Sequence, residues 1–170
     1  MFRNHYLTLL FLAPFTLIYS QNVTINDLIT LKNFDDKVKV EEFLAMKGWT
    51  FYSSSVQTDF NDRDIIIYAY NPVGPNNMAT CFIHQYFENI AASSSIKIET
   101  TSLPKYNEYL NKIKSFGCTL LSSENTDGSI KKVYQGKSTT FEIKVLSQTF
   151  NESTVTVYSI LISHNYDYEE

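Results

Sequence analysis

Two similar segments of the sequence decide the fold: KGWTFYSS at residues 47–54 and FGCTLLSS at residues 116–123. Each segment follows an amphipathic stretch, and each has a glycine, Gly48 or Gly117, before a run of apolar and hydroxyl residues. Glycine ends helices because it adopts the left-handed conformation at low cost, and Trp, Phe and Thr favour strands. The sequence therefore predicts, twice, a helix that leads into a strand.

Both predicted helices carry end signals. The first is predicted over residues 34–47, with Asn33 as its N-cap, and the second over residues 103–116, with Ser102 as its N-cap. In the second helix four apolar residues recur at helical spacing, which indicates one buried face. They are Tyr106, Tyr109, Leu110 and Ile113.

Each helix is followed by four predicted strands. Asp127-Gly128 is a strong hairpin signal, and the alternation of apolar and polar residues over 140–145 is typical of a sheet with one solvated face. The fold class is therefore α+β: two tandem helix-plus-four-strand units with antiparallel sheet and with the helices packed on one face. The strands are predicted near 49–55, 64–70, 79–87 and 94–100, and near 118–123, 129–135, 139–147 and 154–163.

The predicted domain organisation has four parts. Residues 1–20 form a signal peptide, 21–33 an N-terminal lead-in, 34–100 the first α+β repeat unit, and 101–170 the second, which ends in a short acidic tail. A unit of about 70 residues buries little core by itself, so we expect the two units to pack together, either as one continuous sheet or as two sheets side by side. The alternative is one unrepeated domain whose two helix-to-strand segments are alike by chance.

The N-terminus predicts export from the cytoplasm. Arg3 precedes an apolar run from Tyr6 to Tyr19, and polar residues begin at Ser20. This order is typical of a secretory signal peptide. The run is shorter than the roughly 20 residues that a bilayer-spanning helix needs. We therefore expect a secreted or periplasmic protein with no transmembrane segment in its mature part.

Composition favours a folded chain whose partner is not nucleic acid. Hydrophobic residues make up 44% of the sequence and aromatic residues 15%, whereas disordered chains are poor in both. The formal net charge is -4, and no cluster of Lys and Arg stands out. Phosphate backbones are bound by concentrated positive charge. We therefore expect a protein partner, and the sequence leaves the oligomeric state open.

The two cysteines, Cys81 and Cys118, have two interpretations. In an oxidising compartment they are able to form a disulfide. Cys118 occupies the position of Trp49 in the other segment, which is a core position by pattern, so unpaired thiols are the favoured interpretation. Neither cysteine belongs to a Cys-x-x-Cys pair, which disfavours redox catalysis and cysteine-rich zinc sites.

No motif in the sequence predicts a catalytic, cofactor or metal site. His84 and His164 lack the short spacing of a zinc pair, and no serine stands in a Gly-x-Ser-x-Gly elbow. Asp59, Asp62 and Asp64 form the densest carboxylate cluster, but their spacing does not match a calcium loop, and a polar turn is the favoured interpretation. We expect no cofactor and no metal.

Five tyrosines on predicted strands form the candidate interaction surface. Tyrosine combines a large ring with a hydroxyl group and is enriched at protein interfaces. It is also an ordinary strand former, and the sequence does not tell which sheet face each ring occupies. The candidates are Tyr68, Tyr70, Tyr86, Tyr134 and Tyr158.

The predicted outline resembles that of the β-lactamase-inhibitor proteins and related envelope modules, which also consist of tandem helix-plus-sheet units. The signature helix sequences of those proteins are absent here, so the resemblance concerns the outline alone and transfers no residues. It implies that a concave sheet serves as a protein-binding surface.

Three classes of function follow from these observations. The favoured one is an exported non-catalytic module that binds a protein, in the manner of an inhibitor. The alternatives are an envelope or extracellular structural component that self-associates, and a small hydrolase whose site is assembled only in space. A broad patch of Tyr and Phe favours the first class, association through sheet edges the second, and a deep pocket that joins a histidine to carboxylates the third.

Overall fold

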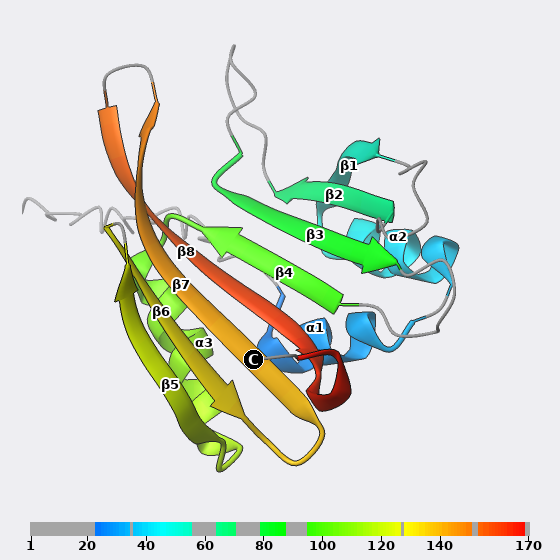
Figure 1. The fold of residues 1–170 in the computed structure, drawn as a ribbon. Helices are drawn as coiled ribbons and strands as arrows, with labels where there is room; N and C mark the ends of the chain where they lie inside the picture. Colours follow the sequence, from blue (N-terminus) through cyan, green and yellow to red (C-terminus); the bar gives the residue numbers. More distant parts are fainter. Residues whose placement is uncertain are drawn as a thin grey trace, which may run out of the picture.

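The order of helices and strands along the chain is the predicted one except for an additional first helix. The structure, a computed structural model, describes residues 23–34, 36–55, 64–70, 79–87, 95–126, 128–150 and 153–168. In these ranges the fold is mixed α+β and mostly sheet, with three α-helices and one antiparallel sheet of eight strands (Figure 1). The predicted α+β class with antiparallel pairing is confirmed.

The element bounds agree with the predicted strands to within a few residues. The helices are α1 (Ile25–Lys32), α2 (Lys37–Met46) and α3 (Leu103–Ser115), and a short 3-10 helix, η1 (Asn165–Asp167), follows the last strand. The strands are β1 (Trp49–Ser55), β2 (Asp64–Tyr70), β3 (Cys81–Phe87), β4 (Ser95–Thr100), β5 (Thr119–Thr126), β6 (Ser129–Gln135), β7 (Thr139–Phe150) and β8 (Ser153–His164).

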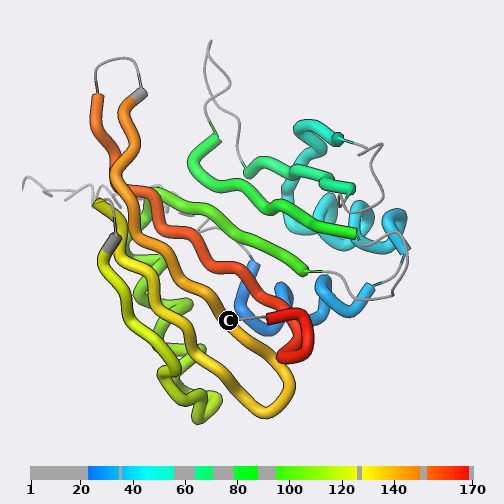
Figure 2. Tube along the Cα trace, in the orientation of Figure 1, coloured from blue at the N-terminus to red at the C-terminus, as the bar shows by residue number. Residues whose placement is uncertain are grey.

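The strand order in the sheet is β1-β2-β3-β4-β8-β7-β6-β5. Strands that are consecutive in the sequence pair with each other, except at the centre, where β4 pairs with β8 and Ile98 lies opposite Ile160. Figure 2 shows the chain leaving β4 through α3 to β5 at the far edge and then returning strand by strand to β8. Among the described strands, β1 and β5 are therefore the two edges of the sheet.

Helix α1 lies in the stretch that the sequence assigned to a lead-in. Its N-cap is Thr24, whose hydroxyl accepts a hydrogen bond from the Asp27 backbone N–H at 3.1 Å, while the Asp27 carboxylate accepts from the Thr24 N–H at 2.8 Å. This capping box satisfies two N–H groups at the helix start. Asn33 is the C-cap of α1, and Asp36 is the N-cap of α2. The prediction that Asn33 starts a helix over 34–47 is therefore wrong, because two short helices share this region.

Helices α2 and α3 end as their glycines predict. Gly48 and Gly117 adopt φ values of 79° and 71°, in the left-handed region. Their backbone N–H groups donate to the carbonyl oxygens of Ala45 and Lys114, at 2.9 and 3.1 Å. These bonds satisfy carbonyl groups that the end of a helix leaves without partners.

The two strands that follow these glycines share an irregularity. The pairing of β1 with β2 shifts between Phe51 and Ser53, and the pairing of β5 with β6 shifts between Leu120 and Ser122. The shifts occupy equivalent positions in the segments KGWTFYSS and FGCTLLSS. The similarity of the two segments therefore extends from sequence to backbone geometry.

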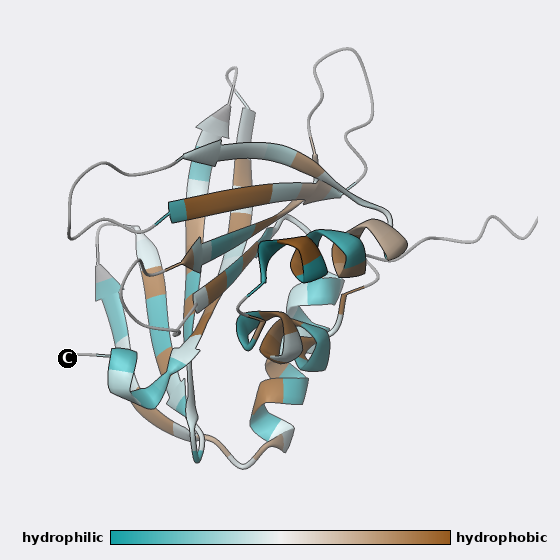
Figure 3. Cartoon of the chain, turned by 90° about the vertical axis from the view of Figure 1, so that its right-hand side faces the viewer, coloured by the Kyte–Doolittle hydropathy of each residue, from teal (hydrophilic) through white to brown (hydrophobic). Residues whose placement is uncertain are grey.

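One hydrophobic cluster joins the three α-helices to alternate residues of the strands. Figure 3 shows apolar and hydrophilic residues alternating along both kinds of element. Full burial of one such side chain is worth about 1.5–3 kcal/mol relative to exposure. We call the sheet face that carries this cluster the core face. Its members include Leu28, Leu31, Leu44, Ile83, Ile98, Tyr109, Ile113, Ile143 and Ile160.

The strand residues between those of the core face point the other way. In β3, for example, Ile83 is buried on the core face, while the neighbouring Phe82 and His84 are half-buried on the opposite face. We call this opposite face the polar face. It carries Phe82, His84, Tyr86, Lys97, Glu99, Lys131, Glu142, Lys144, Ser159 and Leu161.

Some sequence predictions fall outside the described residues, namely the signal peptide of 1–20 and the aspartates Asp59 and Asp62. The third member of that cluster, Asp64, begins β2 and forms an ion pair of 3.1 Å with Lys37 of α2. It therefore ties a strand to a helix. Within the described ranges, none of the helices has both the length and the apolar character needed to cross a membrane.

Candidate functional site: the polar face

Three strands at the centre of the sheet bring oppositely charged residues together. Pairing places Lys97 of β4 and Glu142 of β7 on either side of Leu161 in β8. In the next row the order of charges is reversed, with Glu99 on β4 and Lys144 on β7. Because neighbouring strands lie about 4.8 Å apart, the backbones that carry the two charged residues of each row are about 10 Å apart across β8.

Glu99 is held by two basic side chains. Lys97 Nζ lies 2.8 Å from Glu99 Oε1, and His84 Nε2 lies 3.1 Å from Oε2. The hydrogen bond with His84 is the largest cause that lowers the pKa of Glu99; Lys97 adds to it, burial opposes it, and the result is a pKa of about 2. Glu99 is therefore a fixed negative charge at neutral pH.

Lys97 is correspondingly a fixed positive charge. Burial tends to lower the pKa of Lys97, but hydrogen bonding and attraction to Glu99, with a further contribution from Tyr86, raise it above the ordinary lysine value. The pair is thus ionised on both sides although each side chain is less than a third exposed, at 23% for Lys97 and 28% for Glu99.

Glu142 is arranged in the same way on the other side of β8. Its Oε1 lies 2.8 Å from Lys144 Nζ, and its Oε2 lies 3.3 Å from Lys131 Nζ. Burial tends to raise the pKa of Glu142, but the two lysines outweigh burial and lower it. The Glu142 side chain is 14% exposed, against 47% for Lys144. A molecule that approaches here meets an ammonium group before the carboxylate.

A groove of about 480 Å³ lies over these charges. Ser95 lines it with only 5% of its surface exposed, and the Ser95 Oγ has no hydrogen-bond partner among the residues that the structure describes. A buried hydroxyl left unpaired costs about 1–3 kcal/mol. The lining also includes Tyr86, Leu146, Gln148, Ser159 and Leu161.

A row of rings adjoins the groove along β3. Tyr52 of β1 packs edge-on against Phe82, with ring centres 5.4 Å apart. The His84 ring lies 6.5 Å from Phe82 and 6.5 Å from Tyr86, and it is nearly parallel to Tyr86. Aromatic rings on a strand offer contact area at a small cost in side-chain entropy. The polar face therefore combines aromatic area with fixed charges.

The five tyrosines expected at an interaction surface do not share a face. Tyr68, Tyr70 and Tyr134 are 2%, 5% and 8% exposed and belong to the core cluster. Tyr158 is half-buried and stacks on a tyrosine of α3 at 4.5 Å. These four rings lie on the core face and offer little area to a partner. Tyr86 lies on the polar face and lines the groove.

Cys81 and Cys118 are both unpaired in the structure. Cys81 is fully buried in β3, and burial raises the pKa of its thiol to about 12. Cys118 directly precedes β5, and β4, β8, β7 and β6 all lie between β3 and β5 in the sheet. A disulfide needs Cα atoms within about 7 Å of each other. A bond between these two cysteines does not fit this strand order.

The two histidines lie in different surroundings. His84 is on the polar face with Glu99, whereas His164 Nδ1 lies 3.1 Å from Lys32 Nζ of α1. Burial and the charge of Lys32 lower the pKa of His164. Among the described residues, no group of His, Cys, Asp and Glu is arranged to hold a metal ion.

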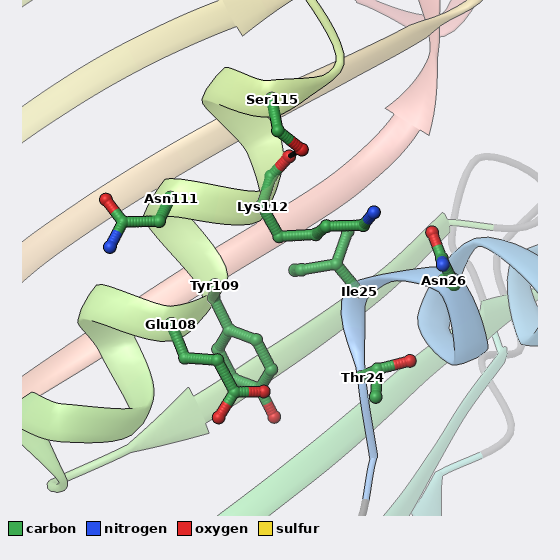
Figure 4. A pocket seen from close by; sticks show the side chains of 8 residues that line it. All are labelled: Thr24, Ile25, Asn26, Glu108, Tyr109, Asn111, Lys112 and Ser115. Atoms are coloured by element: carbon green, nitrogen blue, oxygen red, sulfur yellow. Dashed lines mark hydrogen bonds between the residues drawn. The ribbon is translucent and has the colours of Figure 1, made fainter.

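A second hollow, of about 420 Å³, lies between α1 and α3. Figure 4 shows Glu108 and Tyr109 on α3, with Thr24 and Ile25 on the opposite side. The Tyr109 hydroxyl donates to the Val23 carbonyl at 2.8 Å, which fastens the start of α1 to α3. The hollow is thus a seam between two helices, and four of the side chains that line it already form hydrogen bonds, namely those of Thr24, Glu108, Tyr109 and Ser115.

Comparisons with protein-family models, with curated proteins and with solved structures find no match to this chain. The function must therefore be argued from the residues of the polar face.

The charged residues of this face are not among the site residues that the sequence predicts. The signal that could have found them is a pair of opposite charges two residues apart in a strand: Lys97 with Glu99, and Glu142 with Lys144. Successive side chains of a strand alternate between faces, so residues two apart share one. Two such pairs in strands that become neighbours of one central strand predict a charged surface.

Proposed function

We propose that this chain is an exported, non-catalytic protein-binding module and that the polar face is its contact surface. The observation that carries the proposal is the combination, on one sheet face, of the aromatic row with ion pairs that remain charged at neutral pH. Aromatic side chains are enriched at protein interfaces, and fixed charges give a partner its orientation. A sheet holds such groups in place before binding, which lowers the entropy cost of association.

The proposal includes two tandem helix-plus-four-strand units whose helices pack on the core face. Three observations support it. Gly48 and Gly117 are equivalent, and so are the register shifts in β1 and β5. In both halves the chain runs from an edge strand, β1 or β5, inward to a central strand, β4 or β8. In such an arrangement the helices occupy one face of the sheet and leave the polar face to a partner.

Export is proposed from the signal-peptide pattern of residues 1–20. N-terminal sequencing of the protein recovered from the medium or the periplasm checks it. We expect the recovered chain to begin near Gln21. Recovery of the protein from the cytoplasm with Met1 retained would contradict the proposed location.

The His84–Glu99 pair is the feature closest to a catalytic constellation. In a serine hydrolase the histidine also accepts a hydrogen bond from the nucleophile. The Ser95 hydroxyl shares the polar face with His84 but makes no hydrogen bond to it or to any other described residue. This geometry favours binding over catalysis.

Site-specific photo-cross-linking tests the contact surface. A photoreactive phenylalanine analogue replaces Phe82 or Tyr86 on the polar face, and the matched control replaces Val38, which is 60% exposed on α2. The labelled proteins are added to the extracellular or periplasmic fraction of the source cells. We expect one and the same partner to be captured from both polar-face positions and not from position 38. Capture from position 38 alone would refute the proposed surface.

Exposed apolar residues on both edge strands favour a second candidate function, self-association. Phe51 and Tyr52 of β1 are 57% and 53% exposed, and Leu120 and Leu121 of β5 are 48% and 43% exposed. Unpaired strand edges with apolar side chains are templates for pairing with another chain. Sedimentation over a range of concentrations tests this candidate. A dimer that Phe51→Ser or Leu120→Ser abolishes supports it, and a monomer at every concentration contradicts it.

A further inference from the structure

The groove on the polar face presents positive and negative groups in balance. Its lining includes Lys97 and Lys144 together with Glu99 and Glu142. Each carboxylate oxygen of the two glutamates lies within 3.3 Å of one basic side chain and, having two lone pairs, is able to accept a second hydrogen bond. An ammonium group has three donors. A partner that matches this face therefore needs both donors and acceptors, which a purely acidic or a purely basic ligand lacks.

The four charges form a checkerboard of two rows that cross the strands. In the first row Lys97 of β4 shares β8 as its neighbour with Glu142 of β7, and in the second row Glu99 does so with Lys144. Same-face residues of one strand repeat about every 7 Å, so this is the spacing of the rows. Each lysine thus has a glutamate next to it along its own strand and another across β8.

A checkerboard of this kind is complementary to itself. Consider a twofold axis that lies in the plane of the face and crosses the strands midway between the two rows. It brings the first row of one copy over the second row of the other, so that Lys97 meets Glu99 of the second copy and Glu142 meets Lys144 of the second copy. Each contact then occurs twice. Sheets that pack face to face keep their strands within about 30° of each other, which agrees with this axis.

The aromatic row favours this axis over a twofold axis along β8. His84 of β3 stands in the first row and Phe82 in the second. The axis across the strands places β3 of one copy on β3 of the other, so Phe82 meets His84 of the second copy, and ring contacts of this kind are favourable. An axis along β8 would also pair opposite charges, but it would place these rings on β6, whose residues in the two rows are Val133 and Lys131.

The residues that continue the rows toward β5 bring no like charges together. The second row continues with Lys131 and Glu124, whereas the first continues with Val133 and Ser122, which carry no charge. The whole chain has a formal net charge of -4, so two copies repel each other at long range. At the checkerboard this repulsion is replaced by attraction between opposite charges.

We propose that the polar face binds the polar face of a second copy of this chain, related by a twofold axis that crosses the strands between the two charged rows. The inference rests on the proposed function, because it names the partner of the contact surface proposed there. It differs from association through strand edges, since the two copies meet face to face and the edges β1 and β5 take no part.

Charge reversal followed by sedimentation equilibrium of the exported chain tests the checkerboard. Lys144→Glu places a glutamate over Glu142 of the second copy, and Glu142→Lys places a lysine over Lys144 of the second copy. Each clash occurs twice, so a loss of about tenfold at each contact weakens the dimer about a hundredfold. The matched control, Lys39→Glu at an exposed position of α2, changes the net charge as Lys144→Glu does and should leave the dimer unchanged.

Mixing the two variants shows that they are folded and that the contacts are reciprocal. In an equimolar mixture of Lys144→Glu with Glu142→Lys, a glutamate faces a lysine at both contacts, so we expect heterodimers to form. A wild-type chain that is monomeric at every concentration would overturn the proposal, and so would variants that dimerise as the wild type does or a mixture that remains monomeric.

Cross-linking within the dimer tests the axis. A photoreactive phenylalanine analogue at position 82 should form a covalent dimer, and mass spectrometry should find the cross-link on the β3 peptide that contains His84 of the second copy. A cross-link to β6 of the second copy would overturn the proposed axis.

The outcomes also separate this inference from the proposed function. If the chain is monomeric, while photo-cross-links from Phe82 and Tyr86 capture a different protein, the dimer fails and the proposed function stands. If the chain dimerises but only Phe51→Ser or Leu120→Ser abolishes the dimer, the inference fails in favour of edge association. If cross-links from the polar face are absent altogether, both the inference and the proposed function fail.

Discussion

The core face and the polar face are built from alternate residues of the same strands, yet different forces organise them. In β8, Ile160 is 1% exposed within the core cluster, whereas its neighbour Leu161 is half-buried between Lys97 and Glu142. Apolar burial is non-directional and dominates folding, while ion pairs fix the positions of particular groups. The comparison contrasts two faces of one sheet: the core face is buried in the hydrophobic cluster, and we propose that the polar face is available to a partner.

Truncation of neighbouring residues on the two faces gives the largest expected contrast. Ile160→Ala removes a fully buried side chain and should lower the free energy of unfolding by about 2–5 kcal/mol. Leu161→Ala, one residue along the same strand, should cost about 1 kcal/mol or less because its side chain is only half-buried. Urea unfolding measures both. Equal losses of the free energy of unfolding in the two variants would show that the polar face also stabilises the fold.

A smaller loss of the free energy of unfolding is expected when the Tyr109 hydroxyl group, which joins α3 to the start of α1, is removed. Tyr109→Phe removes the hydrogen bond to the Val23 carbonyl and leaves that buried oxygen without its donor, which should cost about 1–3 kcal/mol. The control is Tyr166→Phe, since Tyr166 is 72% exposed. Chemical denaturation of both variants provides the comparison, and a Tyr109→Phe variant as stable as the control would show that α1 is held by apolar packing alone.

The smallest expected effect is the dependence of folding stability on pH that Glu99, on the polar face, causes. Its folded-state pKa of about 2 lies below the ordinary value of 4.5, so the unfolded chain takes up a proton first as the pH falls. The stability due to Glu99 is therefore fully present above pH 4.5 and is lost as the pH falls toward 2. The stability difference between the wild type and Glu99→Gln should shrink across this window.

Urea midpoints between neutral pH and pH 2 measure that difference, and Glu42→Gln, at an exposed position of α2, controls for the removal of one carboxylate. If the stability difference between the wild type and Glu99→Gln did not change with pH, His84 and Lys97 would not form their ion pairs with Glu99 in solution.

Much of the fold is predictable from local signals in this sequence. The bounds of β1 and β6 agree with prediction because a glycine, Gly48 or Gly128, marks the start of each strand. Helix α1 was missed because it has only eight residues and its capping box lies close to the expected signal peptide. The pairing of β4 with β8 could not be read from the sequence, since it depends on contacts between residues far apart in the chain.

The candidate site was less predictable for a physical reason. Period-two alternation groups Tyr68 with Tyr70 on one sheet face, but it does not tell which face is buried. Both rings are in fact buried. Tyr86 was the one candidate tyrosine on the polar face. The pairing of His84 with Glu99 depends on the register of β3 against β4, which no local pattern specifies.

Hydroxyl-radical footprinting of the complex with the cross-linked partner tests the central claim most directly, because it reports the side chains that binding covers. The account predicts that oxidation of Tyr52, Phe82 and Tyr86 falls several-fold in the complex, while oxidation of Met46, which is 80% exposed on α2, is unchanged. Protection of Met46 with unchanged oxidation of Phe82 and Tyr86 would place the partner on the helices and contradict the account.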